Sequence, residues 1–268
     1  MKRIFILLLL TICILSACSV NKDVKEKSSN IDSNIKNEDK KGNTKVEKPV
    51  DPNVILLPKE YFNVLETINN RKIIQNPEND RLLVNTEFYL SASFIPDELV
   101  APQVQFTFSE QNLDKRYLRQ VAAKALESMF TASKESGHEL RAVSGYRSYQ
   151  RQSELFNAKV KANGELEAEK WVARPGTSEH QTGLSMDISS LNYGNKLEQG
   201  FDQTNEFRWL TQNAYKFGFI LRYPANKEDI TKHSYEPWHY RFVGIDVATE
   251  MVKRGLCFEE FMMNAKPI

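Results

Sequence analysis

The chain has 268 residues, and its 36 lysines and arginines nearly balance 35 aspartates and glutamates, which leaves a formal net charge of +1. A near-neutral chain lacks the excess of positive charge that nucleic-acid binding requires, so we expect no nucleic-acid partner. Only three cysteines occur, which excludes a disulfide scaffold. The length suits one globular domain with a lead-in.

Residues 1–17 are typical of a secretory signal peptide. Two basic residues precede an apolar run over residues 4–15, which is too short to span a bilayer comfortably. The run ends in the letters LSAC, whose last residue is Cys18. This ending resembles a bacterial lipobox, in which the cysteine becomes the lipidated first residue; an ordinary signal peptide with an incidental cysteine is the alternative. The prediction is a lipoprotein anchored through Cys18 at the outer face of the bacterial cell membrane.

Residues 18–53 are predicted to form a tether. From residue 19 to residue 50 the chain is rich in Lys, Asn, Ser, Asp and Glu and contains no aromatic residue. Such a segment cannot bury enough apolar surface to offset the entropy lost on ordering, so we expect it to be solvated. The remainder is divided into a lead-in over residues 54–110, packed on the main domain, and the main domain over residues 111–268.

The lead-in has weak secondary-structure signals. A short helix is predicted around residues 61–65. Residues 81–108 indicate short extended pieces, because prolines interrupt short apolar runs there.

Helices and strands alternate irregularly in the main domain. Apolar residues recur at helical spacing from Leu118 to Met129, and Gly137 can supply a left-handed stop. The later predictions are a strand over residues 139–143, a helix over 149–163, a strand over 184–189, a helix over 205–217 ended by Gly218, strands over 219–222 and 238–243, and a helix over 246–254. Because there is no regular β-α-β rhythm, the predicted fold class is α+β.

Two short segments of this domain hold the residues with the most informative chemistry. His180, Asp187 and His239 offer two imidazoles and one carboxylate, a three-ligand set typical of a catalytic zinc site. Zinc is favoured over magnesium or calcium, because those harder ions prefer oxygen ligands. Glu236, close in sequence to a ligand, is a candidate general base. The predicted chemistry is metal-assisted hydrolysis.

The spacing of these residues constrains their local structure. Seven residues separate His180 from Asp187, which fits a turn leading into a strand and not one helical face. Pro237 argues against a helix between Glu236 and His239, so we expect an extended segment that leads into the following strand, with a bend at Pro237 that aims both side chains inward.

Other residues with reactive or aromatic side chains are assigned structural roles. His138 and His233 are predicted to be surface or hydrogen-bonded residues, as most single histidines are. Cys257 lies between apolar neighbours and is predicted to be a small buried hydrophobe. Trp171 and Trp238 could line a groove, but packing in the core is favoured for both.

Taken together, the motifs resemble those of the VanY-type D-alanyl-D-alanine carboxypeptidases of bacterial cell walls. The matching segments are SGYRSY (144–149) with Gln152, SEHQTGLSMD (178–187), FGFILRYP (217–224) and EPWH (236–239), with further agreement at 83–85 and 95–100. The resemblance covers about residues 81–256. It implies a small α+β domain with a central antiparallel sheet flanked by helices, shared with related murein peptidases and hedgehog-type domains.

The resemblance also implies a role for each site residue. One zinc ion per chain is held by His180, Asp187 and His239, and Glu236 is the catalytic acid/base. Arg147 faces the substrate carbonyl or the terminal carboxylate and assists catalysis. The implied substrate-binding residues are Arg147, Gln152 and Ser178.

The implied activity is removal of the C-terminal D-alanine from peptidoglycan stem peptides by a monomeric enzyme. A D,D-enzyme cuts pentapeptides that end in D-Ala-D-Ala, whereas an L,D-enzyme of the same family cuts tetrapeptides. We favour the D,D-activity because it is the broader family activity. A murein endopeptidase would need a groove open at both ends, and an inactive wall-binding module would fit the loss of a ligand or of Glu236.

Overall fold

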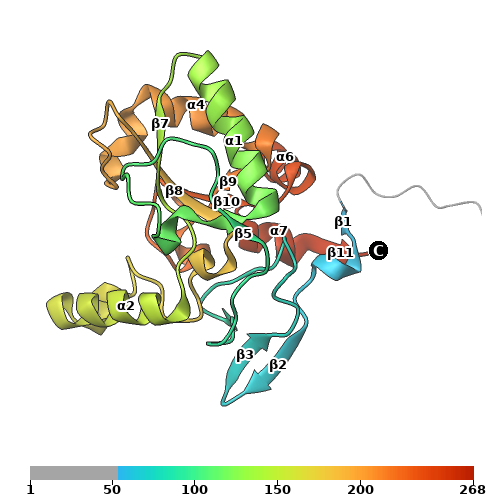
Figure 1. Cartoon of the computed structure of the whole chain (residues 1–268). Helices are drawn as coiled ribbons and strands as arrows, with labels where there is room; N and C mark the ends of the chain where they lie inside the picture. Colours follow the sequence, from blue (N-terminus) through green and yellow to red (C-terminus); the bar gives the residue numbers. More distant parts are fainter. Residues whose placement is uncertain (1–53) are drawn as a thin grey trace, which may run out of the picture. The chain divides into compact units, whose positions relative to one another are not determined.

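The computed structural model describes residues 54–268, which belong to one compact unit of the chain, Pro49–Ile268 (Figure 1). The predicted signal peptide, tether and lipidation site at Cys18 lie outside the described residues. Within residues 54–268, no helix combines the length and the hydrophobicity needed to cross a bilayer.

A four-stranded antiparallel sheet forms the centre of the unit (Figure 1). Its strands, in spatial order, are β7 (Leu140–Ser144), β8 (Ser185–Ser190), β10 (His239–Phe242) and β9 (Phe219–Leu221). All three neighbouring pairs are antiparallel. Since successive residues of a strand point to opposite faces of the sheet, each strand supplies both faces in alternation.

One face of this sheet is apolar and is covered by the helices α1 (Gln120–Glu135) and α4 (Asn205–Asn213). Met186 and Tyr240 from neighbouring strands are fully buried with Leu126 of α1 and Leu210 of α4. Burial of each such side chain contributes about 1.5–3 kcal/mol.

The other face of the central strands is buried but polar. Asp187 of β8 and His239 and Arg241 of β10 are at most 5% exposed. Beside it, a second apolar cluster joins β1 (Ile55–Leu57) to α6 (Ile245–Arg254) and α7 (Phe258–Asn264). The apolar face therefore carries the core, and the polar face is left for the site.

The lead-in is attached to the main domain by short strand pairs. The strand β1 pairs in parallel with β11 (Ala265–Pro267) near the C-terminus, and β5 (Leu99–Val100) pairs with β6 (Leu118–Arg119). Between β1 and β5 along the chain, the strands β2 (Leu65–Ile68), β3 (Arg71–Ile74) and β4 (Phe88–Tyr89) form a small sheet.

The remaining helices are α2 (Tyr149–Asn163), α3 (Glu165–Ala168) and α5 (Glu228–Thr231), with short 3-10 helices η1 (Lys59–Tyr61), η2 (Asp114–Arg116), η3 (Glu179–Thr182), η4 (Gln199–Gln203) and η5 (Ala214–Phe217).

The predicted α+β class is confirmed, and most elements of the main domain lie where they were predicted. The predicted helix at 61–65 is wrong: only η1 is helical, and the chain then extends into β2. The reason lies in Asn76, whose side chain bonds both the Val64 N–H and the Phe62 carbonyl and so holds the extended backbone. The last helix and strand, α7 and β11, were not predicted.

Candidate metal centre

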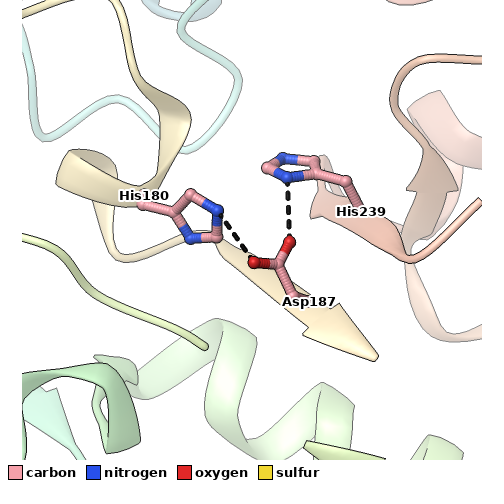
Figure 2. A group of neighbouring side chains, drawn as sticks. All are labelled: His180, Asp187 and His239. Carbon is pink, nitrogen blue, oxygen red and sulfur yellow. Dashed lines mark ion pairs between the residues drawn. The ribbon is translucent and has the colours of Figure 1, made fainter. Parts of the chain in front are cut away.

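Asp187 and His239 are direct partners in the register of β8 and β10. Directly opposed residues of antiparallel strands have Cβ atoms about 4.5–5.5 Å apart, so both side chains project together from the polar face. His239 Nδ1 lies 3.1 Å from Asp187 Oδ1 (Figure 2). The strand pairing alone thus assembles two of the three predicted ligands.

The third predicted ligand, His180, lies on η3 just before β8. Gly183 ends this helix at a positive φ of 66°, and a Cβ there would come within 2.9 Å of Leu99 Cδ2, so the turn requires glycine. His180 Nδ1 bonds the Gly145 carbonyl at 2.8 Å. Its Nε2 faces Asp187 Oδ2 at 3.4 Å (Figure 2).

These three side chains fit a metal ion. One ligand atom from each lies within 4.8 Å of the others. Asp187 Oδ1 is buried and accepts no hydrogen bond from the described residues, and such an atom is costly unless a partner satisfies it. A cation between the three side chains would satisfy it, and two imidazoles with one carboxylate are the donor set of a catalytic zinc site.

Electrostatics at the centre favours ionised Asp187 and neutral His180. Burial alone would raise the pKa of Asp187, but His180 and His239 hold it well below its ordinary value. Burial lowers the pKa of His180 despite the attraction of Asp187. For His239, burial is outweighed by Asp187 and Glu179, which raise its pKa to about 9. A metal ion would bind the neutral imidazole, so His239 would have to lose this proton.

Glu236 lies beside the ligands at the bend that precedes β10. The bend predicted at Pro237 is a turn of Pro237 and Trp238, in which the His239 N–H donates to the Glu236 carbonyl at 3.2 Å. Proline at this place is compatible with a turn because its φ is fixed. Glu236 Oε2 lies 3.8 Å from His239 Nδ1. Burial, reinforced by Asp187, raises the pKa of Glu236 to about 8.

Arg147 reaches the same cavity from the turn after β7. Its Nη1 donates to Gln152 Oε1 at 2.9 Å, and its Nη2 donates to Ser144 Oγ at 3.3 Å. Gln152 is itself fixed by a 2.6 Å bond from its Nε2 to the Ala173 carbonyl. The guanidinium is therefore held in place, and its positive charge faces Asp187 and Glu236.

The cavity at the metal centre has a volume of about 510 Å³ and brings all the predicted catalytic and binding residues of the described chain together. Its predicted lining residues are Arg147, Gln152, Ser178, His180, Asp187, Glu236 and His239. Trp171 and Trp238 also line it. Trp238 is buried, as predicted, whereas Trp171 is only partly buried. Cys257 is buried, as predicted.

The positions of two cavity residues were not predictable from the sequence. His233 is hydrogen-bonded, as predicted, with its Nδ1 3.2 Å from the Ser234 carbonyl, but it also lines the cavity, stacks on Tyr223 with ring centroids 4.2 Å apart, and lies 3.9 Å from Glu236. Glu179 is fully buried behind His239. No pattern in one sequence distinguishes either residue, because their contacts cross the fold.

A cavity with a three-ligand metal centre, a buried carboxylate beside it and a fixed arginine on its wall defines a metal-dependent hydrolase site. The family model described as VanY, D-alanyl-D-alanine carboxypeptidase, matches residues 115–245. YodJ of Bacillus subtilis (strain 168) is 45% identical over 257 residues, which cover 96% of this chain and 92% of that protein. The chain belongs to the VanY-type D-alanyl-D-alanine carboxypeptidase family.

Solved structures agree with this assignment. The LdcB LD-carboxypeptidase has a TM-score of 0.78 and 48% sequence identity, and the match covers 80% of this chain and all of that one. The D,D-pentapeptidase VanY from a VanB-type resistance cassette, solved with Zn(II), has a TM-score of 0.54 and 36% identity. That match covers 67% of this chain and 97% of the other.

Proposed function

We propose that this protein is a zinc-dependent carboxypeptidase that removes the C-terminal D-alanine from peptidoglycan stem peptides. The observation that carries the proposal is the placement of Glu236 and Arg147 beside the His180, Asp187 and His239 set in one cavity. Zinc is the metal because the donor set suits it and because a family member binds Zn(II). One ion is expected per chain.

Each protein group has a distinct task in this reaction. Zinc supplies Lewis-acid chemistry that polarises the oxygen of water or of a carbonyl group. Glu236 takes a proton from the attacking water and returns it to the nitrogen of the departing D-alanine. Burial raises its pKa to about 8 in the metal-free protein, and a cation bound beside it would lower that pKa and so favour the ionised carboxylate that accepts the proton. Arg147 places a fixed positive charge where the peptide's carboxylate binds or where the oxyanion develops. Gln152 holds that guanidinium.

Two bond specificities remain as candidates. The D,D-activity on pentapeptides is the first, because the family is described by it. The L,D-activity on tetrapeptides is the second, and the similarity to an LD-carboxypeptidase over 80% of the chain favours it. Both reactions release D-alanine, so the cavity chemistry is common to them. A murein endopeptidase and an inactive wall-binding module are both disfavoured. The inactive module is disfavoured because the three predicted metal ligands and Glu236 are all present in the cavity.

Defined stem peptides distinguish the two specificities. The purified protein is incubated with a pentapeptide ending in D-Ala-D-Ala and, separately, with the tetrapeptide ending in one D-Ala, and released D-alanine is measured. The D,D-assignment predicts faster release from the pentapeptide, with the tetrapeptide accumulating. Release from the tetrapeptide alone would replace it with the L,D-assignment.

We also propose that the enzyme is a monomeric lipoprotein at the outer face of the cell membrane, anchored through Cys18. The support is the LSAC ending of the apolar N-terminal run, and a substrate in the cell wall is consistent with that place. Cell fractionation of a Cys18→Ala variant tests the anchor: loss from the membrane fraction supports it, and unchanged membrane binding contradicts it.

A further inference from the structure

The imidazole ring of His239 lies between two carboxylates. Its Nδ1 is 3.1 Å from Asp187 Oδ1 on one side, and its Nε2 is 3.4 Å from Glu179 Oε2 on the other side. Nε2 is buried and makes no hydrogen bond of good geometry with the described residues, so Glu179 Oε2 is the carboxylate oxygen placed to accept its proton. Ser185 Oγ also donates to Glu179 Oε2, at 3.3 Å. Glu179 is 1% exposed, so solvent does not compete for this position.

Two arginines hold Glu179 in place. Arg222 Nε and Arg241 Nη1 both donate to Glu179 Oε1, at 2.8 and 2.9 Å, and both arginine side chains are fully buried. Arg222 is bound on its outer side by both oxygens of Glu259, at 2.8 and 2.6 Å. The two arginines occupy Oε1 and leave Oε2 directed at His239.

Stability alone is a weak reason for this buried cluster. Replacing buried ion pairs with well-packed apolar residues is often neutral or stabilising. Metal-binding histidines, in contrast, commonly donate their second ring N–H to a carboxylate or carbonyl, which fixes the tautomer and the orientation of the ring. The cluster is located where such an acceptor is needed for His239.

We infer that Glu179 is a positioning residue for the zinc site: it accepts the Nε2–H of His239 and so keeps the Nδ1 lone pair directed at the metal. The inference rests on the proposed function. His180 has the complementary arrangement, since its Nδ1 bonds the Gly145 carbonyl and its Nε2 faces Asp187. Asp187 thus faces Nε2 of His180 and Nδ1 of His239, and in each ring an acceptor lies near the opposite nitrogen.

Zinc affinity of matched variants tests the inference. Glu179→Gln removes the negative charge behind His239, and Glu259→Gln removes a buried carboxylate from the same Arg222 without touching the histidine. Competition with a chromophoric chelator measures zinc binding by the purified full chain. We expect Glu179→Gln to weaken zinc binding by about 10- to 100-fold and Glu259→Gln to leave it nearly unchanged, with both variants melting at lower temperature.

The possible outcomes are separable. Equal zinc affinity in wild type and Glu179→Gln, or an equal loss in both variants, would overturn the inference, whereas a wild-type protein that binds no zinc would overturn the proposed function. If Glu179→Gln does not fold, nitrogen-15 NMR of the zinc-loaded wild type decides. The inference predicts that the Nε2 of His239 carries a slowly exchanging proton, and a proton-free Nε2 would contradict it.

Discussion

Asp187 and Glu236 are buried carboxyl groups in one cavity whose pKa values move in opposite directions. Asp187 faces two imidazoles, which hold its pKa low despite burial. For Glu236, burial dominates and raises the pKa to about 8, while His239 and Arg147 oppose the rise. Paired carboxyls with diverging pKa values commonly mark a division of tasks. The division proposed here is between metal ligand and acid/base.

Substitution of Glu236 tests that division. Glu236→Gln removes the group that accepts and returns the proton but leaves the three ligands in place, so zinc affinity should stay close to that of wild type while kcat falls by about 10²- to 10⁴-fold. Zinc titration and D-alanine release, measured on the same preparation, check both parts. A variant that keeps most of its turnover would show that another residue acts as the base.

His233 makes the stability of the zinc-free protein sensitive to acid. Burial lowers its pKa from 6.5 to about 4, so between these values the unfolded chain binds a proton that the folded chain does not. The contribution of His233 to stability is therefore constant above pH 6.5 and falls as the pH drops from 6.5 towards 4. The loss between pH 7.5 and pH 5 is about 2 kcal/mol by this linkage.

His233→Phe removes the proton-binding group and keeps a ring to stack on Tyr223. Urea unfolding of the zinc-free variant at pH 7.5 and pH 5 should show a decrease in unfolding free energy about 2 kcal/mol smaller than that of wild type. Identical pH dependence in the two proteins would contradict the assignment of this acid sensitivity to His233.

Local signals made the elements of the main domain predictable. Ser148 caps α2 by accepting from the Arg151 N–H, and Gly164 ends it at a positive φ, so both predicted boundaries are correct. Alternation of apolar and polar residues in β8 also predicted which face bears Asp187. By contrast, β2 is exposed along its whole length and has no such alternation, and β11 pairs with β1 from the other end of the described chain. Sequence periodicity carries no signal for either.

Gly145 links the turn that carries Arg147 to the metal centre. A Cβ at this position would lie 2.5 Å from the Tyr117 carbonyl oxygen, a backbone atom that cannot rotate away. The carbonyl of Gly145 also accepts from His180. Gly145→Ala should therefore displace the turn, lower stability by about 1–3 kcal/mol, and reduce D-alanine release.

Gly200→Ala is the matched control, because its added Cβ would meet the hydroxyl end of the Tyr193 side chain. Urea unfolding and turnover of both variants are compared with wild type. Equal, small effects of the two substitutions would contradict the role given to the backbone contact at Gly145.

At the scale of the whole molecule, the lead-in over residues 54–110 packs as part of the folded unit. Arg241 Nη2 donates to the Leu82 and Asp80 carbonyls at 2.9 and 3.2 Å, and Leu82 and Val84 are fully buried in the main core. Removal of the lead-in would expose these core contacts and leave buried Arg241 without two acceptors, which is costly.

A fragment of residues 111–268 should therefore fail to fold, while residues 54–268 should fold. Circular dichroism and cooperative thermal unfolding of the two fragments make the comparison. A cooperative, zinc-binding fragment 111–268 would show that the lead-in is dispensable.

The sequence motifs predicted the candidate metal ligands, Glu236 and the turn that carries Arg147, and the structure brings these residues into one cavity. They were predictable because each lies in a short segment with a distinctive local pattern. The Glu179 cluster and the His233 stack were not, since Arg222, Arg241 and Glu259 reach Glu179 from separate elements. Contacts of that kind exist only once the chain has folded.

Zinc dependence of D-alanine release is the most direct test of the function proposed for this protein. The purified protein is assayed with the stem pentapeptide and tetrapeptide as isolated, after complete removal of metal by a chelator, and after addition of one equivalent of Zn²⁺. The predicted result is release that disappears with the metal and returns when one zinc per chain is restored. Release that continues at the original rate after all zinc has been removed would contradict the proposal.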